Sequence, residues 1–183
     1  MSVWDALEQH SHLLVTGEPG AGKSTMSSHL ARTLSRLWLR DDSAVDPPIT
    51  EPVVPLRVSA RSLDTSGSWS AILAHAACRS FGSGLRQDAD PSLFVGRVQG
   101  ARWLVLVDGL DEIPDSQLRR DVIRSVLQHA RPDSDYRFVL TTRTMHWFIK
   151  RGFVQVEADW LPEARKRKYN WDRKSMVFVK KLA

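Results

Sequence analysis

A glycine-rich loop between an apolar run and a helical pattern is the feature that most constrains the fold of this chain. Residues 17–24 read Gly-Glu-Pro-Gly-Ala-Gly-Lys-Ser and match the phosphate-binding pattern G-x-x-x-x-G-K-[ST] at every fixed position. The apolar run at 13–15 before the loop predicts a buried parallel strand. After it, apolar residues recur at helical spacing and predict a helix over 25–38. The chain thus supplies the strand, loop and helix that the pattern requires.

The residue types of this loop suit a ligand with several phosphates. Glycines let the backbone turn tightly, so that amide N–H groups can point at the ligand. The start of the following helix adds unpaired N–H groups and the positive end of its dipole. We predict that Lys23 contacts the β- and γ-phosphates and that the Ser24 hydroxyl ligates Mg²⁺. The complete predicted phosphate-binding set is Gly17, Glu18, Pro19, Gly20, Ala21, Gly22, Lys23, Ser24 and Thr25. The alternative is an ordinary glycine-rich turn.

A second pattern places carboxylates at the end of another strand. Residues 103–108 form a continuous apolar run that ends in Asp108, as in a central parallel strand that delivers a side chain to its C-terminal edge. We expect this strand to neighbour the glycine loop, and Asp108 to hold Mg²⁺ opposite Ser24. Asp111 and Glu112 follow three residues later, and Glu112 is the favoured group to orient or deprotonate an attacking water. The alternative is a solvated acidic turn that caps the next helix.

A third polar group ends the predicted strand at 137–143. Arg143 lies at the C-terminal end of this strand, where its guanidinium could contact a γ-phosphate. The alternative is a surface arginine paired with an acid. The predicted catalytic residues are therefore Glu112, Asp111 and Arg143, and the predicted metal ligands are Ser24 and Asp108.

Further strand and helix patterns alternate along the chain. Strands are predicted at 53–59, where Pro55 favours an edge position, and at 153–157. Helices are predicted at 68–78, with Ser68 as N-cap, at 91–99 and at 115–130. This alternation predicts an α/β fold, a three-layer core with a mostly parallel sheet of about five strands and helices on both faces.

Composition limits the environment and the partners of the chain. Cys78 is the only cysteine among 183 residues, so an internal disulfide framework is excluded and a reducing cytoplasm is favoured. No apolar run approaches the roughly 20 residues that span a bilayer. The last 21 residues contain eight Lys or Arg and two acids, whereas residues 1–162 contain 18 basic and 19 acidic residues. The body is thus nearly neutral, and a general nucleic-acid footprint is not indicated.

The basic C-terminal end differs in composition from the rest. Up to residue 162 the basic residues are 16 Arg and two Lys, whereas the end contains three Arg and five Lys. We therefore predict two parts, a domain over 1–158 and a basic tail over 159–183. The hypothesis for this tail is a disordered, foreign or out-of-frame end of a truncated gene. The alternative is a tail that binds an acidic partner or nucleic acid.

Taken together, the three motifs resemble one family over about residues 11–157. Residues 17–24 look like a Walker A motif, residues 103–113 look like the extended Walker B of NACHT-type NTPases, and residues 138–143 are similar to the sensor-1 strand of that family. The resemblance implies the STAND class of signal-transducing ATPases, in which another strand separates those of the phosphate loop and Walker B. It also implies ATP or GTP with Mg²⁺ as a switch, slow hydrolysis and an active homo-oligomer. The helical bundle and winged-helix domain of that family are not found in this chain.

The function expected from the sequence is therefore a nucleoside-triphosphate-binding switch domain with slow Mg²⁺-dependent hydrolysis, in a cytoplasmic protein. Two alternatives stay open. One is a DNA-associated AAA-type ATPase, against which the near-neutral body counts. The other is a non-hydrolysing, truncated interaction module. A P-loop kinase is disfavoured, because no lid-like arginine cluster follows the phosphate loop.

Overall fold

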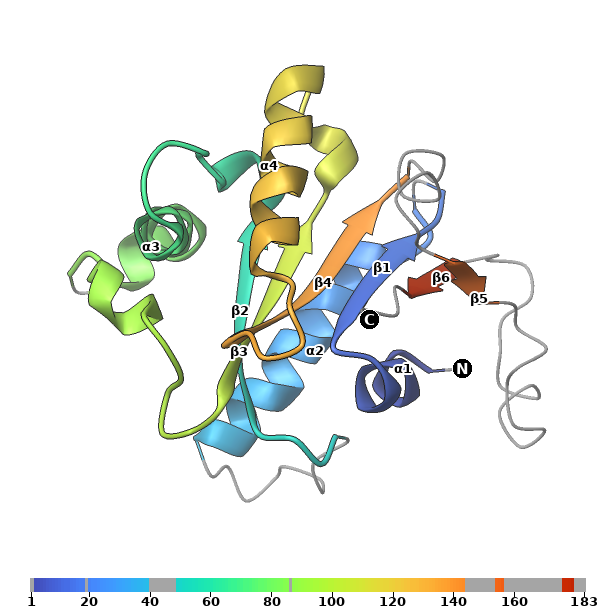
Figure 1. Cartoon of the computed structure of the whole chain (residues 1–183), viewed down its shortest axis with the longest axis horizontal. Coiled ribbons are helices and arrows are strands. Elements are labelled where there is room, and N and C mark those ends of the chain that lie inside the picture. The colour runs from blue at the N-terminus through green and yellow to red at the C-terminus, as the bar shows by residue number, and fades with distance from the viewer. Residues whose placement is uncertain are drawn as a thin grey trace.

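A central β-sheet with helices on both faces forms the body of the molecule (Figure 1). The structure is a computed structural model. It describes residues 2–18, 20–39, 49–85 and 87–143, together with the backbone of two short strands at 154–156 and 176–179. The mixed α/β class predicted from the alternating patterns is confirmed.

The sheet has six strands in the order β2-β3-β4-β1-β6-β5. Their bounds are β1 His12–Thr16, β2 Val53–Ser59, β3 Arg102–Asp108, β4 Tyr136–Thr142, β5 Val154–Val156 and β6 Met176–Val179. Strands β1 to β4 are parallel to one another, whereas β6 is antiparallel to both β1 and β5. The parallel part therefore contains four strands, which place their carboxyl ends at one edge of the sheet.

One strand prediction needs correction and another is confirmed. The sheet expected to be mostly parallel with about five strands has four parallel strands, because the strand predicted at 153–157 forms β5 and pairs antiparallel with β6. β4 lies between β1 and the strand that ends in Asp108, so the separation of these two strands that the resemblance implied is confirmed. The edge position expected from Pro55 is confirmed, because β2 ends the sheet. A proline lacks the backbone N–H that a residue of a central strand donates to a neighbouring strand.

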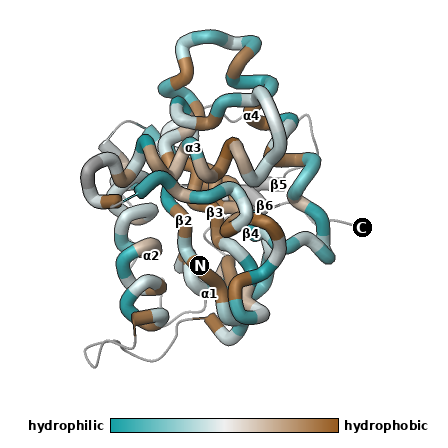
Figure 2. Tube along the Cα trace, turned by 90° about the vertical axis from the view of Figure 1, so that its left-hand side faces the viewer, coloured by the Kyte–Doolittle hydropathy of each residue, from teal (hydrophilic) through white to brown (hydrophobic). Residues whose placement is uncertain are grey.

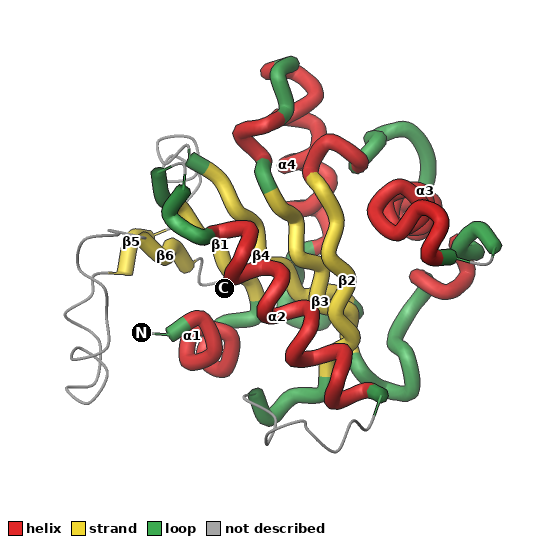
Figure 3. Tube along the Cα trace, turned by 180° about the vertical axis from the view of Figure 1, so that it is seen from behind, coloured by secondary structure: helices red, strands yellow, loops and turns green. Residues whose placement is uncertain are grey.

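Four α-helices cover the two faces (Figures 1 and 3). Helices α1 (Val3–Gln9) and α2 (Lys23–Trp38) lie on one face, and α3 (Trp69–Phe81) and α4 (Ser116–His129) lie on the other. Ser68 caps α3 as predicted, since its hydroxyl accepts a hydrogen bond from the Ala71 amide. No helix in the described ranges is long and apolar enough to cross a membrane.

Short 3₁₀ turns connect these elements at Ala60–Ser62, Gly82–Gly84, Pro91–Phe94 and Leu110–Glu112. The helix predicted at 91–99 is limited to the third of these turns. Gln99 and Gly100 have φ angles of 50° and 85°, which do not continue a right-handed helix. The backbone reverses there instead, and Val98 forms a bridge with Ala101.

The sheet divides the apolar core into two clusters. Leu14 and Phe138 belong to the cluster under α3 and α4, while Leu13 and Val139 belong to the cluster under α1 and α2. Successive residues of a strand point to opposite faces, so the apolar runs of β1, β3 and β4 fill both clusters at once. Figure 2 shows the result as hydrophobic strands between mixed helices. A sheet buried in this way holds its C-terminal edge rigidly.

A buried charged network stabilises the opposite, N-terminal edge of the sheet. Arg137 of β4 is 3% exposed and donates a hydrogen bond of 3.0 Å to Glu51 and one of 2.8 Å to the His10 carbonyl. Arg102 of β3 donates two hydrogen bonds to the same carboxylate. These bonds, the Arg102 hydrogen bonds above all, hold the pKa of Glu51 below its usual range. Next to this network, burial lowers the pKa of His12 to about 4.

Candidate functional site

The glycine loop lies at the carboxyl end of β1 and leads directly into α2. Its last glycine, Gly22, is the N-cap of α2 and has a φ of 81°. Such left-handed backbone is open to glycine at little cost and strains other residues, which explains the residue at this position. The first N–H groups of α2 have no partner within the helix and face the loop. The loop therefore presents unpaired backbone donors at the sheet edge.

Lys23 lies across this loop. Its ammonium group donates hydrogen bonds to the carbonyl oxygens of Gly17, at 2.6 Å, and of Glu18, at 3.0 Å. The Ala21 amide donates to the same Glu18 carbonyl at 3.1 Å. The lysine charge is thus held beside the donors of the helix N-terminus, a combination that attracts an anion.

Asp108 is the acceptor at which several elements meet. Its Oδ1 accepts hydrogen bonds from the Ser24 hydroxyl of α2, at 3.2 Å, and from the Thr141 hydroxyl of β4, at 2.7 Å. Its Oδ2 forms an ion pair of 2.6 Å with the Arg57 guanidinium of β2. The structure therefore brings Ser24 and Asp108 together, as predicted from the sequence, although β4 separates their strands.

The acidic turn after β3 begins with a conformation that suits glycine. Gly109 has a φ of 76°, and a Cβ at this position would lie 2.7 Å from Cδ of Glu112. The Gly109 amide donates a buried hydrogen bond of 2.9 Å to the Thr141 hydroxyl. The chain then forms the 3₁₀ turn Leu110–Glu112, which places Asp111 and Glu112 beside the loop.

Asp111 and Glu112 have different partners. Asp111 accepts a hydrogen bond of 3.0 Å from the Arg143 amide, and its side chain is 18% exposed. Glu112 is 54% exposed, and its carboxylate lies 3.8 Å from the Arg61 guanidinium. Asp111 is thus fixed by the end of β4, while Glu112 faces solvent with a loose partner.

Most of the predicted residues line one cleft of about 440 Å³ at this edge. The predicted residues in its wall are Gly20, Gly22, Lys23, Ser24, Thr25, Asp108, Asp111, Glu112 and Arg143. Gly17, Glu18 and Ala21 belong to the loop but are not in the wall, and Pro19 lies outside the described residues. The three sequence motifs therefore meet in space, while the role of each residue stays a prediction.

Two residues of the site were missed in the sequence. Thr141 lines the cleft and bonds to Asp108, and it belongs to a strand whose polar end drew attention only to Arg143. Arg57 interrupts the apolar strand β2 two residues before its carboxyl end. A lone arginine near the end of a parallel strand is the signal that could have identified it.

The cations of the site are Arg57, Lys23 and Arg143, and its described residues form no ready-made metal cage. Within the described ranges, no group of three or more His, Cys, Asp or Glu residues could hold a metal ion. The Asp108 carboxylate already has Arg57 as its positive partner. The arrangement is suited to binding an anion at the loop and less to binding a bare cation.

Comparison with known proteins gives partial matches. The chain is 67% identical to an amino-acid acetyltransferase of Ralstonia nicotianae over 45 residues, which are 25% of this chain and 10% of that protein. It is 56% identical to the amino-acid acetyltransferase of Escherichia coli (strain K12), again over 45 residues, which are 25% of this chain and 10% of that protein. The chain spans about a tenth of the length of these curated relatives. No protein-family model matches it.

These matches contradict the resemblance to NACHT-type NTPases. Both relatives are named amino-acid acetyltransferases, so the prediction of a nucleoside-triphosphate switch with slow hydrolysis is wrong. The AAA-type alternative and the expected cofactors, ATP or GTP with Mg²⁺, are overturned by the same finding. The physical reason is that a glycine loop shows only how phosphates can be bound. It identifies neither the molecule that carries the phosphates nor the reaction.

Proposed function

We propose that the glycine loop binds the linked phosphates of coenzyme A or an acyl-coenzyme A. The observation that carries this proposal is the meeting of the Lys23 ammonium with the free N–H groups of α2 at one cleft. Acetyl groups are commonly carried as thioesters of coenzyme A, and coenzyme A contains a pyrophosphate. The acetyltransferase relatives therefore favour this ligand over other pyrophosphate compounds.

Within this proposal the loop residues bind and do not transfer the acetyl group. The thioester of an acyl-coenzyme A lies at the far end of the pantetheine arm, well away from the pyrophosphate. Residues beside the loop would orient the ligand through its phosphates and leave its thioester elsewhere. The catalytic roles expected for Glu112, Asp111 and Arg143, and the metal-ligand role of Ser24 and Asp108, stay predictions.

The experiment is calorimetric titration of the whole protein with pyrophosphate, coenzyme A, acetyl-coenzyme A and orthophosphate. We expect one site for the first three ligands and weaker binding of orthophosphate, which has one phosphate where the loop can contact two. Absence of pyrophosphate binding at millimolar concentration would overturn the proposal. Tighter binding of ATP than of coenzyme A would refute the ligand class and leave the loop as a phosphate site.

A second candidate function is acetyl transfer to an amino acid, which the names of the relatives favour. The test is release of free thiol from acetyl-coenzyme A in the presence of a panel of amino acids. Thiol release that depends on one amino acid would establish transfer. Binding of acetyl-coenzyme A without such release would limit this chain to the binding step.

We also propose that the chain divides near residue 158, because every described residue of the site lies before residue 144. The part after this point still contributes to the sheet, since β6 pairs with β1. Cleavage at an engineered protease site after residue 158 should leave the affinity for pyrophosphate unchanged. A cytoplasmic location is proposed as well, and the single cysteine favours it. Self-association and nucleic-acid binding by the basic tail stay predictions.

A further inference from the structure

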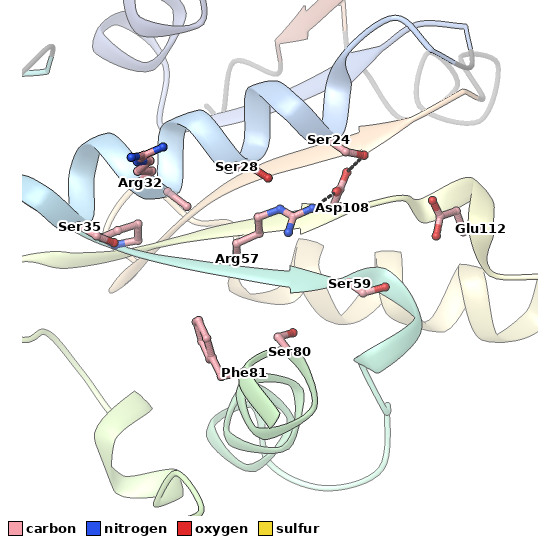
Figure 4. A pocket seen from close by; sticks show the side chains of 12 residues that line it. Ser24, Ser28, Arg32, Ser35, Arg57, Ser59, Ser80, Phe81, Asp108 and Glu112 are labelled. Carbon is pink, nitrogen blue, oxygen red and sulfur yellow. Dashed lines mark hydrogen bonds and ion pairs between the residues drawn. The ribbon is translucent and has the colours of Figure 1, made fainter. Parts of the chain in front are cut away.

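A second cleft lies between α2, β2 and the end of α3 (Figure 4). Its volume is about 660 Å³. Figure 4 shows side chains of α2, β2, β3 and α3 around it, with Arg57 between the strands and α2, and with Phe81 at the end of α3. Hydroxyl groups of Ser28 and Ser80 also line it. The wall therefore combines apolar and polar surface, and its hydroxyl donors come from opposite sides.

This second cleft is continuous with the cleft of the glycine loop. Ser24, Asp108 and Glu112 line both of them, so a ligand whose phosphates lie in the loop can extend past these residues. The ion pair between Arg57 and Asp108 forms part of the shared wall. A ligand in one cleft is thus close to the donors of the other.

Two arginines are the cations of this cleft, whose lining also contains the carboxylates of Asp108 and Glu112. Arg57 is 39% exposed and uses one terminal nitrogen for Asp108, while its Nε is buried without a hydrogen-bond partner. Its guanidinium therefore has donors that the protein leaves unused, since it carries five N–H groups. Arg32 projects from an exposed position of α2, four residues after Ser28 on the same helix face.

The spacing of these arginines from the loop fits a ligand with two separated anionic groups. Arg32 follows Ser24 by eight residues, which corresponds to about 12 Å along the helix axis. Both residues line the second cleft. Arg57 lies between the two, beside Asp108.

We propose that this cleft binds a phosphomonoester on the same ligand whose pyrophosphate lies in the glycine loop. This inference rests on the proposed function. Coenzyme A has the required chemistry, because a phosphomonoester on its ribose is separate from its pyrophosphate. Arg57 and Arg32 donate to that phosphate, and the fork of a guanidinium matches phosphate oxygens. The two arginines make the site selective for coenzyme A over its dephosphorylated form.

The experiment compares the affinities of coenzyme A, dephospho-coenzyme A and pyrophosphate for the wild-type protein and for Arg32→Gln. We expect the wild type to prefer coenzyme A about tenfold or more, as charge-assisted hydrogen bonds are worth this much. Arg32→Gln should reduce that preference toward equality and leave the affinity for pyrophosphate unchanged. Arg79→Gln on α3, which lines a different cleft, is the matched control with the same loss of charge.

Each outcome decides between the two claims. Equal affinities for coenzyme A and dephospho-coenzyme A in the wild type, with pyrophosphate bound, would overturn the second anion site and leave the loop as proposed. A preference that Arg32→Gln and Arg79→Gln reduce equally would also overturn it, because the effect would then be one of net charge. Absence of pyrophosphate binding would overturn the proposed function itself.

Discussion

The guanidinium of Arg57 lies 2.6 Å from the carboxylate of Asp108, across the neighbouring strands β2 and β3. The two strands run in parallel, with Ser59 opposite Asp108, so Arg57 reaches forward along its own strand to make this contact. Asp108 is 11% exposed, and its position at the shared wall of two clefts depends on this pair. The ion pair therefore links the two halves of the proposed binding site.

The strength of this pair can be measured by a double-mutant cycle with Arg57→Met and Asp108→Asn. We expect a coupling free energy of about 1 kcal/mol from denaturant unfolding, because Arg57 is partly exposed and water screens the attraction. The control cycle pairs Arg97→Met with Asp135→Asn, an ion pair of 3.1 Å with both side chains more than 40% exposed. A coupling no larger than in the control would show that the pair does not hold the site.

Thr141→Val should destabilise the fold by about 1–3 kcal/mol, since it leaves the buried Gly109 amide without a partner and removes one of the two hydroxyl donors to Asp108 Oδ1. The hydroxyl of Thr141 accepts from the Gly109 amide and donates to Asp108. Thr141→Ser keeps the hydroxyl and is the control. Equal free energies of unfolding for the wild type and the valine variant would contradict the role of this hydroxyl.

The sequence predicted the parallel strands well because β1, β3 and β4 contain apolar runs that are buried on both faces. Each of these strands was predicted within one residue of its observed bounds. The partner of the edge strand β5 could not be predicted, because β5 pairs with a segment some 20 residues further along the chain. Such a pairing leaves no local pattern in either segment.

In the candidate site, too, local patterns were predicted and contacts that depend on strand order were not. Asp108 and Ser24 were predicted as neighbours because each follows a strand whose end could be identified. Thr141 and Arg57 were missed, since their contacts with Asp108 depend on strand order, which local periodicity does not encode. The glycine loop could not identify the ligand, because its backbone amides contact the phosphates and not the rest of the molecule that carries them.

The stability of the protein should fall as the pH drops from 7 to 4.5, and His12 should account for much of the loss. Burial lowers the pKa of His12 to about 4, from about 6.5 in the unfolded chain. Between these values the unfolded state binds a proton that the folded state does not, so acid favours unfolding. We expect a loss of about 2 kcal/mol in the wild type.

The variant His12→Leu removes this titrating group and should flatten the curve between pH 7 and 4.5. Denaturant unfolding across that range measures both proteins, and His75→Leu on the exposed side of α3 is the control. A wild-type curve as flat as that of His12→Leu would contradict the buried, neutral state of His12.

Glu51→Gln should destabilise the protein at pH 7 and much less at pH 3. Hydrogen bonds from Arg102 hold the pKa of Glu51 below its usual value of 4.5, so the stabilisation is present above that value. It is lost as the pH falls through the lower pKa of the folded state. Unfolding midpoints at both pH values test this, with the exposed Asp88→Asn as control. A difference between wild type and Glu51→Gln that is the same at both pH values would contradict the network.

The most direct test of the phosphate site is pyrophosphate affinity in Lys23→Ala. The ammonium group of Lys23 lies across the loop carbonyls and is the positive charge nearest to the free N–H groups of α2. Calorimetric titration should show at least a tenfold weaker affinity for Lys23→Ala, with an unchanged melting temperature, while Arg79→Ala binds as the wild type does. Equal affinity of Lys23→Ala and the wild type would contradict the assignment of the glycine loop as the phosphate site.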